Sequence, residues 1–156
     1  MSVQMPARHP VTARPRERGL TLVEVLIALL ILSIGLLGLA GLQTASLKFN
    51  TSAYYRTQAT ALAYGLADRM RANRAAALVG SYDAALEDPA PACGAPDLSG
   101  TVPQDDISTW RMALACRLPL GNGSVARNGD DFTLTVQWDD SHGEDAPLQF
   151  QFTTGL

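Results

Sequence analysis

The sequence predicts an α+β protein in which a long N-terminal helix packs, through its second half, on a small antiparallel sheet of about three strands. One observation behind this fold class is an apolar run over residues 20–42, followed by a stretch that contains no proline before Pro89. The other is a set of short segments near the C-terminus in which apolar and polar residues alternate. The 156 residues leave room for one modest globular domain beyond the helix.

Residues 1–19 form a basic leader. They contain three prolines and no apolar periodicity, so we expect a short disordered segment on the cytoplasmic side of a membrane. Their four arginines outnumber a single acid, Glu17, and without them the net charge of the chain changes from −3 to −6. An acidic chain with eight remaining lysines and arginines is a poor electrostatic partner for a phosphate backbone. We therefore expect no nucleic-acid partner.

Residues 20–42 are predicted to form a transmembrane helix. They run LTLVEVLIALLILSIGLLGLAGL, with Glu24 as the single charge, and about 20 apolar residues suffice to cross a bilayer core. Arginines precede this run and none lies within it, which places the N-terminus in the cytoplasm. A secretory signal would have a shorter apolar core that is cut at its far end. We expect a single-pass membrane protein whose C-terminal domain lies on the side of the membrane opposite to the cytoplasm.

Residues 43–79 are predicted to continue the same helix with an amphipathic surface. The whole helix would extend from about Leu20 to about Ala77, which is about 85 Å at 1.5 Å per residue. Apolar residues at spacings of four, three, four and four form one stripe on this second half: Tyr55, Ala59, Leu62, Leu66 and Met70. We expect this stripe to pack on a globular part formed by residues 80–156.

The globular part is predicted to begin with a long loop and to end in the sheet. Four prolines mark a loop around Cys93. Three alternating segments are then expected as strands: residues 109–118, 132–138 and 148–152. The turns between them are expected at Asn128-Gly129 and Ser141-His142-Gly143. Such a sheet needs the helix as a cover, because three short strands alone are marginal in water.

The two cysteines, Cys93 and Cys116, have no second Cys or His at the spacing of metal ligands, so we expect no metal site. If the apolar segment delivers the C-terminal part across the inner membrane, both thiols enter an oxidising compartment in which disulfides form and persist. A disulfide between them would stabilise the domain by about 3 kcal/mol in the chain-entropy model. Two unpaired buried thiols are the alternative.

Other polar groups have two interpretations each. The acids around His142 could bind calcium, but they lack EF-hand spacing, and a solvated acidic turn is the simpler interpretation. Asn122-Gly123-Ser124 fits a glycosylation sequon and is also a good turn. Three arginines near the helix end are expected to be solvated, with carbonyls or a neighbouring subunit as alternative partners: Arg69, Arg71 and Arg74. No catalytic set stands in a recognisable motif, so we expect neither an enzyme nor a cofactor.

The most informative segment is Arg16-Glu17-Arg18-Gly19-Leu20-Thr21-Leu22-Val23-Glu24, directly before the apolar run. It resembles the class III signal of type IV prepilins and pseudopilins, in which a prepilin peptidase cuts after the glycine and methylates the new N-terminus. The resemblance implies a type IV pilin fold, a leader of residues 1–19 that is cut between Gly19 and Leu20, and N-methylation of Leu20. Glu24 then matches the acidic fifth residue of the family.

The chemistry of Glu24 fits this resemblance. A carboxylate inside a membrane helix costs about 2.5–3.5 kcal/mol on insertion scales, so it needs a partner. The free amine of Leu20 in a neighbouring subunit is one, and their contact would set the axial register of a filament. A proton relay or transporter could also hold an intramembrane acid, but this helix carries no other ionisable group.

Three glycines recur every three residues in the apolar run and could allow another helix to approach closely: Gly35, Gly38 and Gly41. The alternative is that glycine is simply commoner in membrane helices. Many major pilins have proline where this chain has Gly41, and most have phenylalanine where it has Leu20. These departures favour a minor subunit.

A longer stretch resembles the PilV family of type IV pilus minor pilins, through Gln43-Thr44, residues 68–74, Trp138-Asp139-Asp140 and the Phe-rich ending. This resemblance covers the helix well and the globular part at scattered points. It implies a subunit that primes pilus assembly, supports twitching motility and adhesion, and moves from the inner membrane to the pilus at the cell surface. Its partners would be the prepilin peptidase, other minor pilins, the major pilin and the pilus assembly machinery.

Three other functions remain open from the sequence. A minor pseudopilin of a type II secretion system has the same signal and the same assembly step. A membrane-anchored periplasmic module unrelated to pili would keep its anchor uncut. A competence pilus would retain the architecture and add binding of DNA.

Overall fold

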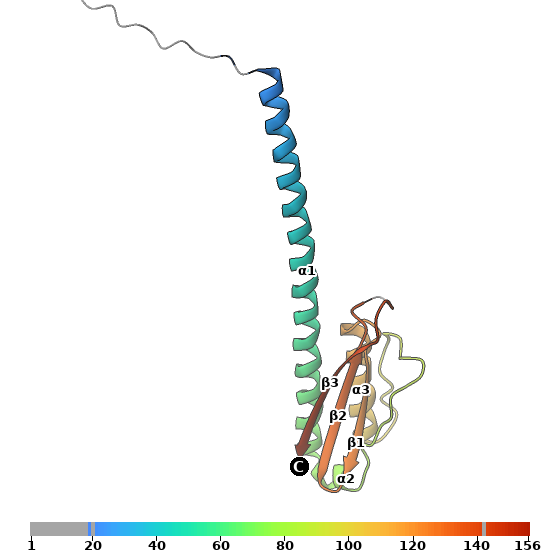
Figure 1. Cartoon of the computed structure of the whole chain (residues 1–156). Helices are drawn as coiled ribbons and strands as arrows, with labels where there is room; N and C mark the ends of the chain where they lie inside the picture. The colour runs from blue at the N-terminus through green and yellow to red at the C-terminus, as the bar shows by residue number, and fades with distance from the viewer. Residues whose placement is uncertain (1–18, 20, 142) are drawn as a thin grey trace, which may run out of the picture. The chain divides into compact units, whose positions relative to one another are not determined.

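The computed structural model describes residue 19 and residues 21–141 and 143–156. Its elements, in order, are α1 (Leu22–Ala72), α2 (Arg74–Leu78), α3 (Val102–Arg117), β1 (Asn122–Asn128), β2 (Asp131–Trp138) and β3 (Leu148–Gly155), as drawn in Figure 1. The chain divides into two compact units, Met1–Thr44 and Ala45–Leu156. The predicted α+β class and the three-stranded antiparallel sheet are confirmed.

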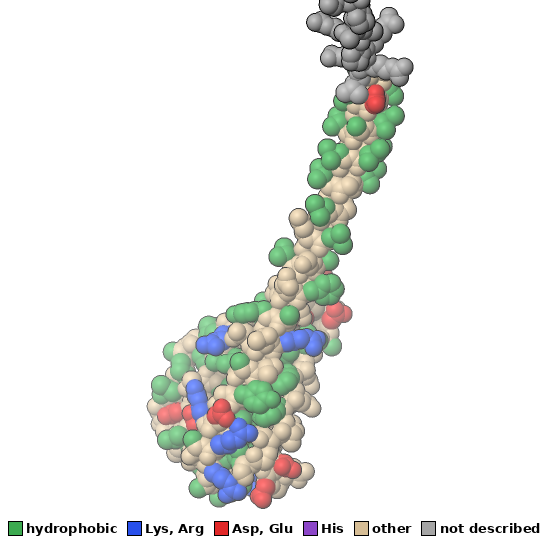
Figure 2. Space-filling model, turned by 90° about the vertical axis from the view of Figure 1, so that its left-hand side faces the viewer, with side chains coloured by type: hydrophobic (Ala, Val, Ile, Leu, Met, Phe, Trp, Pro, Cys, Tyr) green, Lys and Arg blue, Asp and Glu red, His purple; other side chains and the backbone are tan. Residues whose placement is uncertain are grey.

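In the first unit, the described residues from Leu22 onward form a helix whose side chains are all exposed. Figure 2 shows hydrophobic side chains along the visible face of this segment. The helix is long and apolar enough to cross a membrane, by length and composition. A helix that is apolar all round is stable only against an apolar surround, and the described part of the chain gives this one no cover.

In the second unit, α1 supplies one side of the core. The predicted stripe is confirmed: Ala59, Leu66 and Met70 are buried, and Tyr55 and Leu62 are partly buried against the same core. The helix also buries Ala63 and Ala67. Three alanines at intervals of four residues leave little side-chain volume on this face, so the helix axis can lie close to the sheet.

The predicted helix end near Ala77 is only approximately right. Helix α1 stops at Ala72, Asn73 takes a non-helical conformation with φ −116° and ψ 47°, and the five-residue helix α2 follows. Gly80 then adopts a positive φ of 85°, a region that favours glycine and ends the helical path.

The sheet has the order β1-β2-β3, and both pairs are antiparallel. Val125, Leu134 and Phe152 lie side by side in the register, so they share one face. This face is covered by α1 and α3 (Figure 1) and carries the largest buried side chains of the sheet: Phe132, Leu134, Val136 and Trp138. The strands expected over residues 132–138 and 148–152 are confirmed, as is the turn at Asn128-Gly129, where Gly129 has φ 65°.

The strand predicted over residues 109–118 is wrong, because all of this segment except Leu118 lies in α3. A capping box joins Thr101 and Gln104 at the start of the helix, and Pro103 lies in the first turn, where proline is compatible with a helix. Trp110 and Leu114 are buried one turn apart. The apolar alternation over this segment therefore comes from two faces of one helix, Trp110 and Leu114 on one and Met112 and Cys116 on the other.

The remaining strand of the sheet is β1, which replaces the strand predicted over residues 109–118. It begins with Asn122-Gly123-Ser124, where a turn or a glycosylation sequon was expected. A Cβ atom at Gly123 would lie 2.4 Å from Cη2 of Trp110, so the missing side chain lets α3 lie directly on β1. The Asn122 side chain is buried and donates a hydrogen bond to the Glu87 carbonyl at 2.7 Å. A buried, hydrogen-bonded amide is not a glycosylation acceptor.

Candidate functional site

The described start of α1 is held by its own cap. The backbone N–H of Glu24 donates to the Thr21 hydroxyl at 3.3 Å and to the Thr21 carbonyl at 3.1 Å. Glu24 therefore lies in the first turn of the helix, where the positive end of the helix dipole favours a carboxylate. The role of Thr21 was missed in the sequence, although Thr-x-x-Glu before an apolar run is the signature of a capping box.

The other predicted site residues of this region are Gly19, Leu20 and the three glycines of the apolar run. Gly19 is exposed, and Leu20 is outside the described residues. Cleavage between them and methylation of Leu20 stay predictions. At Gly35, Gly38 and Gly41, an added Cβ would meet nothing within 4 Å. The described part of the chain gives these glycines no packing reason, so their role in packing another helix also stays a prediction.

Residues 14–40 match the family described as the prokaryotic N-terminal methylation motif. The chain carries a prepilin-type N-terminus. The match includes the predicted cleavage point and Glu24, and it supports the type IV pilin-like superfamily, which contains pilins and pseudopilins alike. It also fits an inner-membrane-anchored protein that is processed by a prepilin peptidase. No curated protein and no solved structure matches the chain.

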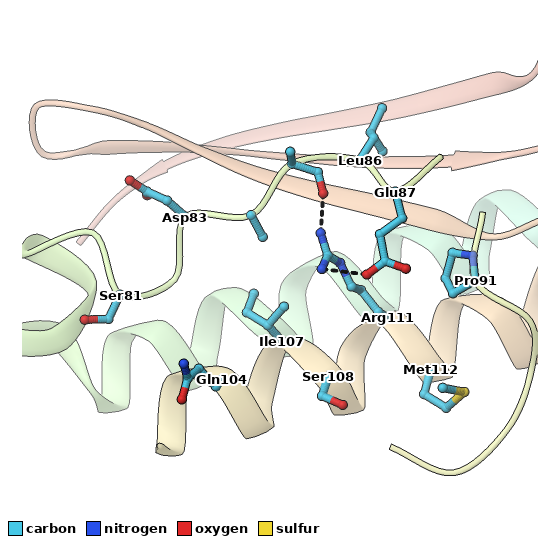
Figure 3. A pocket seen from close by; sticks show the side chains of 12 residues that line it. Ser81, Asp83, Leu86, Glu87, Pro91, Gln104, Ile107, Ser108, Arg111 and Met112 are labelled. Carbon is cyan, nitrogen blue, oxygen red and sulfur yellow. Dashed lines mark hydrogen bonds and ion pairs between the residues drawn. The ribbon is translucent and has the colours of Figure 1, made fainter. Parts of the chain in front are cut away.

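The second unit has a groove between residues 81–87 and α3, with a volume of about 580 Å³ (Figure 3). Arg111 projects into it from α3, forms an ion pair with Glu87 at 2.8 Å and donates to the Ala85 carbonyl. Ala84 forms an isolated β-bridge with Val125, so the upper wall of the groove lies along the outer edge of β1. Pro91 and Met112 line the groove at one end.

A hydrogen-bonded cluster joins the end of α1 to α3. The Tyr82 hydroxyl donates to Asp106 at 2.7 Å, Arg69 pairs with the same carboxylate at 3.3 Å, and the Asn73 amide donates to the Tyr82 oxygen at 3.4 Å. Burial, and then the hydrogen bond to Asp106, raises the pKa of Tyr82 above its ordinary value. The cluster fixes the position at which the chain leaves α1.

Two further arginines fasten the C-terminal strand to α1 and α2. Arg71 donates to the Thr154 hydroxyl and pairs with Asp68, both at 2.7 Å. Arg74 donates to the Leu156 carbonyl at 2.9 Å. Both arginines are exposed, as expected for solvated charges, and each also binds within the chain; the alternative of carbonyl binding is confirmed for Arg74. Arginine suits this use because its planar fork presents several donors at once.

The acidic turn after β2 is organised by its own hydrogen bonds. The Asp139 carboxylate accepts from the backbone N–H and the hydroxyl of Ser141, at 2.8 and 2.7 Å, and the Ser141 hydroxyl accepts from the Asp145 N–H at 2.9 Å. His142 lies outside the described residues. Among residues 19, 21–141 and 143–156, no group of three or more His, Cys, Asp or Glu residues is placed to hold a metal ion.

Cys93 and Cys116 form a disulfide, with their Cα atoms 4.6 Å apart. Both residues are exposed. The bond joins the long loop before α3 to the last turn of that helix.

Proposed function

We propose that this chain is the precursor of a minor pilin of a type IV pilus, similar to PilV, and that it is built into the pilus or primes pilus assembly. The observation that carries the proposal is the methylation motif at residues 14–40, continued by an apolar helix whose side chains the chain leaves uncovered. A folded unit follows on the same chain. These three parts are what a filament subunit requires.

Maturation begins at the leader. The prepilin peptidase cuts between Gly19 and Leu20 and methylates Leu20, which leaves a free N-terminal amine close to Glu24 in the sequence. The mature subunit waits in the inner membrane with the second unit in the periplasm. Residues 1–19 serve as the leader that the peptidase recognises and removes.

Assembly then joins the subunit to its neighbours. Glu24 pairs with the amine of an adjacent subunit, and this contact removes the cost of an uncompensated carboxylate in an apolar surround. Gly35, Gly38 and Gly41 let an adjacent helix approach, in agreement with the open space around each of them. The partners are other minor pilins, the major pilin and the assembly machinery, and the outcome is a pilus that supports twitching motility and adhesion.

The deciding experiment is N-terminal sequencing and intact mass of the membrane-extracted protein, expressed with and without a prepilin peptidase. We expect loss of residues 1–19 and one methyl group on Leu20 only when the peptidase is present. Gly19→Val should abolish the cut, and Gly35→Ala, a matched glycine outside the cleavage point, should not. An unprocessed N-terminus in both samples would return the chain to the class of anchored periplasmic modules.

The methylation motif is equally compatible with a minor pseudopilin of type II secretion, so a second experiment separates the two machines. The full-length protein is cross-linked in cells and purified, and its partners are identified by mass spectrometry. Recovery of pilus minor pilins supports the proposal. Recovery of secretion components in their place assigns the chain to the secretion system. Processing-deficient Gly19→Val serves as the control for contacts that do not depend on assembly.

A further inference from the structure

Residues 88–99, which we call the strap, connect the groove wall to the start of α3. Upstream, Glu87 is fixed by Arg111 and by the Asn122 side chain, which donates to its carbonyl at 2.7 Å and accepts from its N–H at 3.3 Å. Downstream, the N–H of Gly100 donates to Asp105 at 3.0 Å. The capping box of Thr101 and Gln104 follows directly. The strap is therefore a twelve-residue segment between two anchored ends.

Between these anchors the strap touches α3 along one stripe of the helix. The Asp97 N–H donates to the Ser108 hydroxyl at 2.8 Å, and the Gly94 N–H donates to the Met112 sulfur at 2.8 Å. The disulfide joins Cys93 to Cys116. Positions 108, 112 and 116 are spaced by four residues, so they lie one above the other on the same face of the helix.

The strap has no hydrophobic anchor of its own. None of residues 88–99 is buried, and only Ala90, Pro91 and Pro96 are half-buried. The strap has no helix or strand, and its two hydrogen bonds to α3 are exposed to water, which competes for both partners. Ordering a dozen residues has a large entropic cost that exposed hydrogen bonds do not offset. The covalent bond is therefore the strongest contact between the strap and α3.

We propose that the Cys93–Cys116 disulfide is the latch of a redox-dependent strap that closes one end of the groove. Pro91, from the strap, and Met112, from the latched stripe of α3, line the groove at the end where the strap lies (Figure 3). When the latch opens, Pro91 leaves the groove, and Ser108 and Met112, which are half-buried in the oxidised chain, become more accessible. The groove of Figure 3 is thus complete only in the oxidised chain.

The chemistry of the latch is thiol–disulfide exchange. To close it, the two thiols lose two electrons and two protons to a disulfide-bearing oxidant, which becomes a dithiol. To open it, a thiolate of a dithiol reductant attacks one sulfur of the bond and releases the other as a thiolate, and the second thiol of the reductant resolves the mixed disulfide. Both cysteines are exposed, so a reagent can reach the bond in the folded chain.

Opening of the strap is a local change that leaves the core folded. The core consists of side chains from α1, α3 and the sheet, together with Ala77, Tyr82 and Leu118, and no strap residue belongs to it. The inference holds whether the chain acts in a pilus, in a secretion system or alone, so its failure and the failure of the proposed function are distinguishable.

Hydrogen exchange with mass spectrometry on the full-length chain in detergent tests the strap. The oxidised protein, the same sample treated with a dithiol reductant, and the Cys93→Ser/Cys116→Ser double variant are compared. We expect exchange at the Gly94 and Asp97 amides, which donate to α3 in the oxidised chain, to accelerate by about tenfold or more on reduction and in the double variant. Exchange in β1, β2 and α1 should stay unchanged. Unchanged exchange in the strap would show that it is held without the latch, and faster exchange throughout the sheet would show a global staple; either overturns the proposal.

Ser108→Ala in the oxidised protein is the matched control, because it removes the acceptor of the Asp97 N–H and leaves the latch intact. We expect faster exchange only close to Asp97. If this variant frees the whole strap to the same degree as reduction, the hydrogen bond and not the disulfide holds the strap, and the latch is refuted.

Discussion

Leu37 and Leu66 lie on the same helix, and their surroundings are opposite. Leu37 belongs to the first unit and is 75% exposed, whereas Leu66 belongs to the second unit and is 1% exposed. The chain provides a cover of helix and sheet for one leucine and, within the described residues, nothing for the other. A continuous apolar run identifies the first segment and helical periodicity identifies the second, but only the second is completed by intramolecular packing. The first segment needs lipid or other subunits, as expected for a protein that is assembled.

Leu66→Ala should have the largest effect on the stability of the second unit. Truncating a fully buried leucine leaves a cavity and lowers the free energy of unfolding by about 2–5 kcal/mol. Leu37→Ala, the same substitution on the exposed part of the helix, should change the stability of the second unit by less than about 0.5 kcal/mol. Urea unfolding of the full-length protein in detergent measures both, followed by tryptophan fluorescence. Both tryptophans, Trp110 and Trp138, are buried in the second unit and report on it alone.

Equal effects of the two leucine substitutions would contradict the division into one self-sufficient unit and one dependent unit. A large effect of Leu37→Ala would mean that the apolar segment stabilises the folded unit. A small effect of Leu66→Ala would mean that the core adjusts to fill the space.

Glycines offer the second test of the contrast, with a smaller effect. At Gly123 a Cβ would lie 2.4 Å from Trp110 and 2.6 Å from Leu114, so Gly123→Ala overpacks the contact between α3 and β1 and should cost about 1–3 kcal/mol. At Gly38 a Cβ would meet nothing within 4 Å, so Gly38→Ala should leave the unfolding of the second unit unchanged. The same urea titration measures both variants. A neutral Gly123→Ala would show that the helix can move away from the strand without cost.

The parts of the fold that the sequence predicts are those with a single clear period. The apolar run has no competing interpretation, and over residues 132–138 and 148–152 every second residue is apolar while the residues between are Thr or Gln. Residues 109–118 carried two periods at once. Trp110 and Leu114 form one face of α3, toward the core, and Met112 and Cys116 form another, toward the strap. The two faces together imitate a strand, and the capping box at Thr101 distinguishes a helix from it.

Other features of the fold cannot be predicted from a local sequence pattern. The contacts of Asn122 with Glu87 join residues 35 apart in the chain, and the Tyr82–Asp106 hydrogen bond spans 24 positions, so neither leaves a periodic signal. At the N-terminus the reason is different. The proposed cut after Gly19 requires a peptidase, and the proposed partner of Glu24 belongs to an adjacent subunit, so both predictions depend on molecules other than this chain. Their residues were recognisable from the motif and not from packing.

Tyr82→Phe gives the smallest expected effect and tests how firmly the second unit holds the end of α1. Removing the hydroxyl deletes the hydrogen bond to Asp106 and should lower the free energy of unfolding by about 0.5–1.5 kcal/mol at neutral pH. Tyr54→Phe, at an exposed position on the same chain, should be neutral and serves as the control.

The pH dependence of this difference carries a definite sign. The folded chain raises the pKa of Tyr82, chiefly through burial, so it holds the phenolic proton more tightly than the unfolded chain. The stabilisation from this proton is fully present below the unfolded pKa of about 10 and is lost as the pH rises through the folded pKa. The unfolding free energies of the wild type and of Tyr82→Phe should therefore converge above about pH 10, whereas Tyr54→Phe should follow the wild type throughout. If the difference in unfolding free energy between the wild type and Tyr82→Phe stays constant across this pH range, the hydroxyl stabilises the fold by packing and not through its proton.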